Sequence, residues 1–322
     1  MANKFYIGLN MTAIGKVTTI ITTFALSGFV MYTLASQKSE HTNLVPEKPK
    51  VAVTTFALYD IVKHVTGDSL QIVNILPFGV DPHDYEPTPK LMANIEKSAL
   101  VIYSGAGLEP WTHGFSFKHK VLNMSHYVHL REFASAHHHK HSSQENELLD
   151  PHYWLNFKNM QNATKKITDE LVALFPKNEH LYKKNMSLYL LMLQNLDTKY
   201  TQGLERCSLD TIITNHNAFG YLGDKYNFNI ESVSGISPDA QTNAKTIIHL
   251  IREIQEHNVS TIFFESFASD KAIRNIAKQT KIAVDVLEPL GNITADEAKR
   301  KVTYEIMMQE NLVKLSKALH CQ

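Results

Sequence analysis

Residues 177–202 read KNEHLYKKNMSLYLLMLQNLDTKYTQ and contain neither glycine nor proline. Apolar side chains recur in this stretch at alternating steps of four and three, at Tyr182, Met186, Tyr189, Leu193, Leu196 and Tyr200. That spacing puts a single apolar stripe on a helix, and a helix of this length spans roughly 39 Å. We therefore predict one long helix that acts as a rigid linker between two lobes. An ordinary surface helix within one domain is the alternative.

On both sides of this segment, short β-type apolar runs alternate with helical patterns. We predict strands at 51–54, 71–76, 100–103, 211–214, 228–233, 261–264 and 282–287. Helices are expected at 57–65, 89–99, 242–256 and 271–279, with Ser237-Pro238-Asp239 as a helix start. Such alternation is typical of mainly parallel sheets flanked by helices. The predicted fold class is therefore α/β, with two lobes that each contain a short parallel sheet.

The N-terminus has the pattern of an export signal. Lys4 and Lys16 precede an uncharged apolar stretch at 17–34, and Thr33-Leu34-Ala35 offers small residues that a signal peptidase reads. We predict a cleaved signal peptide at 1–35, with an uncleaved anchor as the alternative. The rest divides into a flexible leader at 36–49, an N-terminal lobe at 50–177, the linker helix at 178–203 and a C-terminal lobe at 204–322.

Bulk composition argues against some kinds of partner. Lysine plus arginine equals 32 and aspartate plus glutamate equals 32, so there is no electrostatic reason to bind nucleic acid. We expect a monomer. The two cysteines, Cys207 and Cys321, both lie in the C-terminal half. A disulfide between them and two free thiols are both open, since exported proteins can keep disulfides.

Histidine is the compositional outlier, with 17 residues. Three of them and one glutamate occupy separate turn-forming contexts: Asp81-Pro82-His83-Asp84-Tyr85-Glu86-Pro87, Asp150-Pro151-His152-Tyr153-Trp154-Leu155, Thr214-Asn215-His216-Asn217-Ala218-Phe219-Gly220-Tyr221 and Leu287-Glu288-Pro289-Leu290-Gly291. In open α/β sheets, ligands gather at the carboxyl ends of strands. Imidazoles from separate loops plus one carboxylate suit a borderline-soft dication such as zinc. We predict that His83, His152, His216 and Glu288 hold a metal ion in the junction, so both lobes are metal-binding.

Three neighbours of these residues are candidates for a supporting role. Glu265 follows a predicted strand and could orient a ligand imidazole through its other ring nitrogen, although a plain salt bridge is equally open. Asp285 is a rival for the fourth ligand position, and so is water. Trp154 could form a wall of the site that excludes water, which strengthens ligand bonds, or could be plain core.

A second histidine group, His137, His138, His139 and His141, lies in the low-complexity segment at 134–149. This segment has few apolar residues and is expected to be a mobile loop. Several neutral imidazoles on a tether would raise the local metal concentration without forming a rigid site. We interpret the loop as a weak auxiliary metal trap, with a simple solvated loop as the alternative.

In the order and context of these motifs, the chain resembles the metal-specific solute-binding proteins of bacterial ABC importers, in particular the periplasmic zinc-uptake (ZnuA-type) members. A further motif that carries the resemblance is Tyr103-Ser104-Gly105-Ala106-Gly107-Leu108-Glu109-Pro110-Trp111. The resemblance covers nearly the whole chain from about residue 50. It implies two α/β lobes joined by one long helix, with metal in the cleft. It maps the first two ligands to His83 and His152, the third to His216 and the acidic fourth to Glu288.

Two positions depart from the family pattern. Glu288 stands where the family usually has aspartate, and Asn156 also stands where aspartate is common. Histidine at 216 favours zinc, because manganese- and iron-type relatives often have a carboxylate there. The resemblance thus implies periplasmic Zn(II) capture and delivery to an ABC-type permease, without catalysis. Manganese or iron uptake is the alternative within the class, and a zinc hydrolase or a surface adhesin the alternative outside it.

Overall fold

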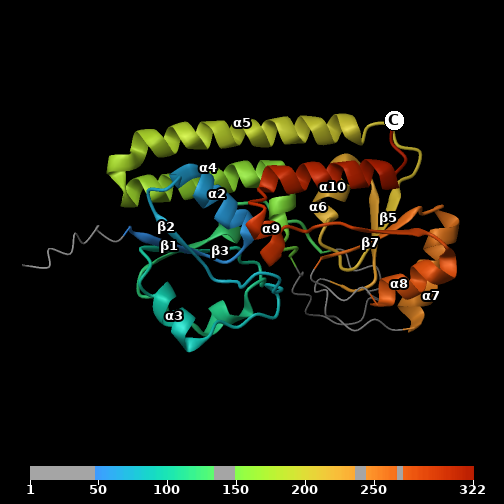
Figure 1. Cartoon of the computed structure of the whole chain (residues 1–322), viewed down its shortest axis with the longest axis horizontal. Helices are drawn as coiled ribbons and strands as arrows, with labels where there is room; N and C mark the ends of the chain where they lie inside the picture. The colour runs from blue at the N-terminus through green and yellow to red at the C-terminus, as the bar shows by residue number, and fades with distance from the viewer. Residues whose placement is uncertain (1–47, 134–148, 236–243, 267–270) are drawn as a thin grey trace, which may run out of the picture. The chain divides into compact units, whose positions relative to one another are not determined.

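The computed structural model describes residues 48–133, 149–235, 244–266 and 271–322 (Figure 1). Several predictions fall outside these ranges: the signal peptide at 1–35, most of the leader at 36–49, the histidines of the 134–149 loop and the helix start at Ser237-Pro238-Asp239. Within the described ranges, none of the helices combines the length and the apolar character that crossing a membrane requires.

Two four-stranded parallel sheets of the same topology form the framework of the described chain. The first has the order β2-β1-β3-β4 and consists of β1 (Lys50–Val53), β2 (Gln71–Asn74), β3 (Leu100–Tyr103) and β4 (Lys120–Asn123). The second has the order β6-β5-β7-β8 and consists of β5 (Thr211–Thr214), β6 (Asn229–Ser232), β7 (Thr261–Phe264) and β8 (Ala283–Val286). The predicted two-lobed α/β fold is confirmed, with one sheet in each lobe.

The central strands β1 and β5 have apolar middles because they are buried on both faces. Val51, Ala52 and Val53 of β1 are at most 1% exposed, and so are Ile212 and Ile213 of β5, as expected for strands inside a parallel sheet that helices flank. The edge strand β4 was not predicted. Its four residues, KVLN, contain only two adjacent apolar residues, of which only Leu122 is buried.

Helices connect the strands in both lobes. The N-terminal lobe contains α2 (Phe56–Thr66), α3 (Pro89–Ile95), α4 (Phe157–Leu174) and the 3-10 turns η1 (Pro110–Gly114), η2 (Met124–His126), η3 (Tyr153–Leu155) and η4 (Pro176–Asn178). The C-terminal lobe contains α6 (Gly220–Tyr226), α7 (Ala244–Glu256), α8 (Lys271–Thr280), α9 (Ala295–Lys299) and α10 (Tyr304–Ala318). Helix α3 starts at Pro89 as predicted but ends at Ile95 rather than 99, because Ala99 already bonds to the Lys50 carbonyl as β3 begins.

The long linker helix is present as α5 (Glu179–Gly203), which packs against α4, α2 and α10 (Figure 1). Its predicted apolar stripe faces these helices. Five of the six stripe residues are buried, and Met186 is half-buried. One element thus contacts helices of both lobes. The burial of the stripe explains why the sequence pattern is so regular.

The chain returns to the N-terminal lobe after β8. The Trp154 indole nitrogen donates to the Pro289 carbonyl at 2.6 Å, and the Phe56 amide donates to the Gly291 carbonyl at 3.0 Å. These bonds fix the turn that follows Glu288 against the N-terminal lobe.

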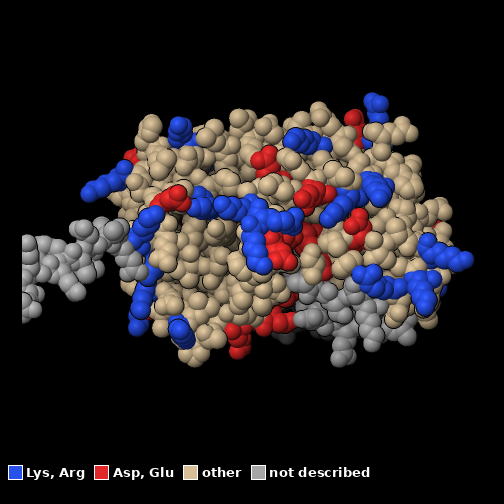
Figure 2. Space-filling model, viewed as in Figure 1, with Lys and Arg blue, Asp and Glu red and all other residues tan. Residues whose placement is uncertain are grey.

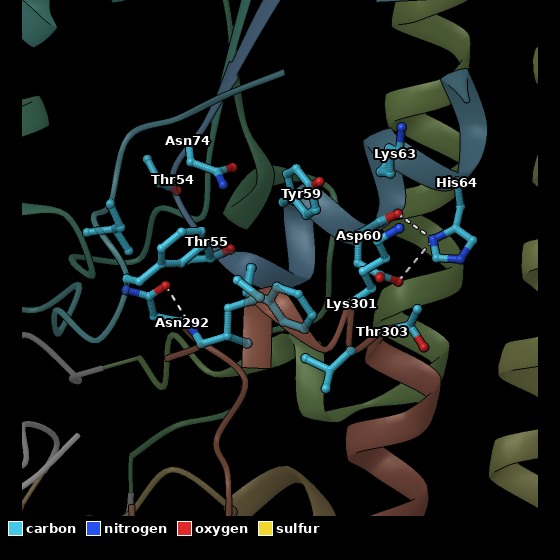
Figure 3. A pocket seen from close by; sticks show the side chains of 16 residues that line it. Thr54, Thr55, Tyr59, Asp60, Lys63, His64, Asn74, Asn292, Lys301 and Thr303 are labelled. Atoms are coloured by element: carbon cyan, nitrogen blue, oxygen red, sulfur yellow. Dashed lines mark hydrogen bonds and ion pairs between the residues drawn. The ribbon is translucent and has the colours of Figure 1, made fainter. Parts of the chain in front are cut away.

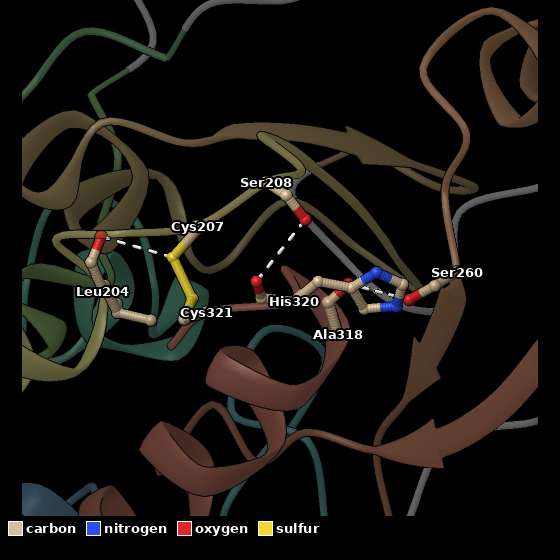
Figure 4. Close-up of a disulfide and its surroundings, with 7 residues drawn as sticks. All are labelled: Leu204, Cys207, Ser208, Ser260, Ala318, His320 and Cys321. Atoms are coloured by element: carbon tan, nitrogen blue, oxygen red, sulfur yellow. Dashed lines mark hydrogen bonds between the residues drawn. A yellow bond between two sulfur atoms is a disulfide. The ribbon is translucent and has the colours of Figure 1, made fainter.

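Cys207 and Cys321 form a disulfide (Figure 4), which settles the alternative that the sequence left open. Beside it, the Leu209 amide donates to the Leu319 carbonyl at 3.0 Å, and the Gln322 amide donates to the Arg206 carbonyl at 3.0 Å. The C-terminus is therefore tied to the segment that follows α5.

Charges of both signs are interspersed on the face drawn in Figure 2. This distribution agrees with the formal net charge of zero. That face has no large patch of a single charge sign that would attract a charged macromolecule over a long distance.

Candidate metal centre

Three loops bring His83, His152 and His216 together between the lobes. His83 lies in the loop between β2 and α3, His152 immediately precedes η3, and His216 follows β5 by two residues. The Nε2 atom of His152 is 3.3 Å from Nε2 of His83 and 3.3 Å from Nε2 of His216. Among the described residues, this is the one group of three potential ligands whose donor atoms all lie within 4.8 Å of one another.

This spacing fits a shared metal ion. Two nitrogens that are each about 2.0–2.1 Å from one zinc ion, at the tetrahedral angle, are roughly 3.3–3.4 Å apart. The space between the rings is a cavity of about 10 Å³. That is about the room one water molecule needs, so a single ion fits between the rings.

The repeated Asp-Pro-His triplet has a local structural reason. In each copy the aspartate Oδ1 accepts a hydrogen bond from the histidine amide two residues later, at 2.7 Å for Asp81 and His83 and at 3.0 Å for Asp150 and His152. This is an Asx-type turn, and the intervening proline restricts the backbone further. Each triplet therefore fixes the direction in which its imidazole points.

Carboxylates orient two of the three rings. Asp150 Oδ1 is 2.8 Å from Nδ1 of His152, and Glu265 Oε1 makes a short contact with Nδ1 of His216. When Nδ1 carries the proton, Nε2 is left with a lone pair that faces the cavity. The predicted orienting role of Glu265 thus has the geometry that it requires. A role for Asp150 was missed, although the repeated triplet was a signal for it.

The surroundings perturb the pKa of each ring differently. Burial, with His152 and His216 nearby, lowers the pKa of His83 well below its usual value. Burial also lowers the pKa of His152, although Asp150 opposes this shift. At His216 burial is opposed by the Glu265 carboxylate, which prevails and raises the pKa. Two of the rings are therefore held neutral, the form that binds metal, and His216 is the ring for which protons compete.

Trp154 forms one wall of the small cavity. Its side chain is 1% exposed, and its ring centroid lies 5.4 Å from that of His152. Asp81, Pro82, Glu265, Pro289 and Gly291 complete the lining. An indole in this position keeps bulk water away from the imidazoles and lowers the local dielectric constant.

Glu288 and Asp285 lie outside this lining. Glu288 is 5% exposed, and its Oε1 accepts a hydrogen bond from Ser266. Burial raises the pKa of Glu288 to about 7, against the effect of that hydrogen bond. Asp285 lies on β8 opposite Phe263, and its Oδ1 accepts from the Val286 amide. The described structure therefore does not bring the predicted fourth ligand, or its rival, into the group of histidines.

A larger cavity of about 700 Å³ lies beside α2 and contains none of the three histidines (Figure 3). Its charged groups are largely paired: Asp60 accepts from Tyr189 and contacts His64, and Lys63 lies 2.6 Å from Asp68. Asp60 is itself 3% exposed. Asp60 links α2 to α5, and the other two contacts lie within α2 and the turn that follows it.

Comparison with known proteins identifies the class. Residues 51–318 match the family model described as zinc-uptake complex component A, periplasmic (ZnuA). The chain is 32% identical over 284 residues to the high-affinity zinc uptake system protein ZnuA of Bacillus subtilis. The aligned region covers 85% of this chain and 88% of that protein. It is 29% identical over 286 residues to the zinc-binding protein AdcA of Streptococcus pyogenes, but spans only 56% of the length of AdcA.

A solved structure agrees with this comparison. The Zn(II)-bound ZnuA-like domain of Streptococcus pneumoniae AdcA superposes with a TM-score of 0.70 at 27% identity, and covers 84% of this chain and 99% of that domain. Two α/β lobes on a long helix, with ligand-type side chains at their junction, define the class of the metal-type solute-binding proteins. Within that class, the chain belongs to the ZnuA family.

Proposed function

We propose that this protein captures one Zn(II) ion between its lobes in the periplasmic space. It then delivers the ion to the membrane permease of an ABC-type importer. The single observation that carries the proposal is the convergence of three imidazole nitrogens, from both lobes, at separations that suit one ion. The zinc-uptake and zinc-binding names of the relatives support the choice of metal. Membership of the zinc-uptake family supports delivery to a permease as the step after capture.

The donor set favours zinc over the manganese and iron alternatives. Neutral imidazoles suit zinc, whereas manganese prefers carboxylate, carbonyl and water oxygens. For the fourth position we favour a water molecule over Glu288, because the Glu288 carboxylate does not line the cavity between the rings and is bonded to Ser266. The proposed ligands are therefore His83, His152, His216 and one water.

Elemental analysis of protein purified without added metal tests the proposal, followed by zinc titration against a chelating dye with manganese as competitor. We expect one zinc per chain and a preference for zinc over manganese. His216→Ala should remove tight binding, because two imidazoles alone hold zinc weakly. His180→Ala is the matched control, since His180 is exposed on α5, and should bind like the unmodified protein. Binding of manganese in preference to zinc, or tight binding by His216→Ala, would contradict the proposal.

A further inference from the structure

The guanidinium group of Arg131 joins the two lobes directly beside the metal centre. Arg131 belongs to the N-terminal lobe, in the segment after η2, and Asp224 lies on α6 of the C-terminal lobe. The Nε atom of Arg131 donates to Asp224 Oδ2 at 2.8 Å, and Nη2 donates to Asp224 Oδ1 at 3.4 Å. Its Nη1 atom donates to Asp150 Oδ2 at 3.0 Å.

Asp150 transmits this contact to a metal-site histidine. Its second oxygen, Oδ1, accepts hydrogen bonds from both the amide and Nδ1 of His152, at 3.0 and 2.8 Å. The Asp150 side chain is fully buried and that of Arg131 is 17% exposed. An unbroken chain of hydrogen bonds therefore runs from Asp224, through Arg131 and Asp150, to the ring of His152.

The start of α6 is shaped around the arginine. The Tyr221 hydroxyl donates to the Asp150 carbonyl at 2.8 Å and accepts from the Arg131 amide at 3.1 Å. The guanidinium carbon lies 5.8 Å from the centroid of the Tyr221 ring. At Gly220, an added Cβ would overlap the guanidinium group. The glycine leaves room for the Arg131 guanidinium group. Tyr221, on the C-terminal lobe, hydrogen-bonds to the backbone of both Arg131 and Asp150 on the N-terminal lobe.

We propose that Arg131 is a positioning residue for zinc, and that the Arg131–Asp224 pair is a clamp between the lobes that slows release of the ion. This inference rests on the proposed function. Separation of the lobes takes Asp224 and Tyr221 away from Arg131 and Asp150, so the support of the His152 ring is complete only while the lobes are together. Since the Asp224 side chain is 64% exposed, dissolved salt screens the attraction between Arg131 and Asp224.

Release of zinc from the full chain into excess chelator, followed by stopped flow, tests the clamp. We expect Asp224→Asn to release zinc roughly 3- to 5-fold faster, as for loss of one exposed ion pair. Arg131→Met should release it roughly 10- to 100-fold faster, as for loss of a partner that orients a metal ligand. Rising salt should accelerate release from the unmodified protein more than from Asp224→Asn. Asp224→Glu, which keeps the charge, should restore slow release and its salt dependence.

Asp68→Asn is the matched control, because Asp68 also pairs with a basic side chain but lies within one lobe. It should release zinc at the unmodified rate. Gly220→Ala provides a second route, since it displaces the guanidinium group without removing a charge, and should also speed release. Unchanged release rates in Asp224→Asn and Gly220→Ala, with stoichiometric zinc still bound, would overturn the clamp and leave the proposed function intact. Failure of the unmodified chain to bind zinc would overturn both.

Discussion

At the scale of single residues, the site depends on the protonation state of one ring. His152 and His83 have pKa values lowered mainly by burial, whereas Glu265 raises the pKa of His216 against the effect of burial. A metal ion must displace the proton from His216 as the pH falls through that raised pKa, so affinity is lost on the acid side. Glu265 thus has two effects: it orients the ring, and it makes binding sensitive to protons.

Zinc affinity should therefore fall with decreasing pH, starting above the usual histidine pKa. We expect a loss of about tenfold per pH unit where one proton is displaced, measured by chelator competition between pH 8 and 5. Glu265→Gln removes the carboxylate that orients the His216 ring and makes it more basic, so affinity should be roughly 10- to 100-fold lower at pH 8. Because the same change removes the cause of the raised pKa, the decline in affinity should begin at a lower pH. A pH-independent affinity in the unmodified protein would contradict ligation by histidine.

A second prediction at this scale concerns the fourth ligand. Glu288 is bonded through its carboxylate to Ser266, and its backbone is fixed on both sides by Asn311 of α10. With water at the fourth position, Glu288→Gln should change the dissociation constant for zinc by less than about threefold, well below the 10- to 100-fold effect of losing even an indirect partner. A loss above a hundredfold in the same competition assay would restore Glu288 as a ligand.

At the scale of elements, α5 packs against helices of both lobes. Its buried stripe contacts α4 and α2 from the N-terminal lobe and α10 from the C-terminal lobe. Tyr200 donates to the Met308 carbonyl of α10 at 2.7 Å, and Tyr189 donates to Asp60 of α2 at 2.7 Å. Polar contacts at the middle and at the C-terminal end of the stripe thus fix the register of the helix.

Truncation of the stripe should destabilise the fold. Leu193 is fully buried, and we expect Leu193→Ala to lower the free energy of unfolding by about 2–5 kcal/mol. Leu191 lies two residues away on the same helix but is 53% exposed, so Leu191→Ala should cost under about 0.5 kcal/mol. Urea unfolding of metal-free protein measures both. Equal effects would show that α5 does not pack through the predicted stripe.

At the scale of the whole molecule, the disulfide encloses nearly all of the C-terminal lobe. Cys207 and Cys321 are 114 residues apart in the sequence. A crosslink of this separation restricts the unfolded chain and stabilises the fold by up to about 5 kcal/mol. Because the bond lies at the junction of α5 and the C-terminus, it leaves the histidine loops untouched.

Replacement of both cysteines by serine should therefore lower the thermal unfolding midpoint by several degrees, while the folded protein still binds zinc with unchanged stoichiometry. Calorimetry with and without zinc measures both effects. Bound zinc should recover part of the loss, since it adds stability only to the folded state. A variant as stable as the unmodified chain would show that the bond does not contribute.

Much of this architecture follows from sequence patterns alone. The apolar runs of β3, β5 and β7 and the stripe of α5 are local signals. A strand that is buried on both faces has consecutive apolar residues, whereas a helix that is buried on one face has apolar residues at steps of three and four. The edge strand β4 left no such signal. Helices α4, α6, α9 and α10 were also missed, although the Asn156 side chain caps α4 by accepting from the Asn159 amide.

The three histidines were identifiable from the sequence because each stands in a turn motif. His216 also follows a predicted strand, and the Asp-Pro-His repeat marks the Asx-type turns that hold His83 and His152. Their distances, the position of Glu288 and the link from Asp224 to His152 were decided by the tertiary structure alone. The reason is physical: turn chemistry acts over a few residues, whereas a contact between Arg131 and Asp224, 93 residues apart, exists only once the two lobes have packed together.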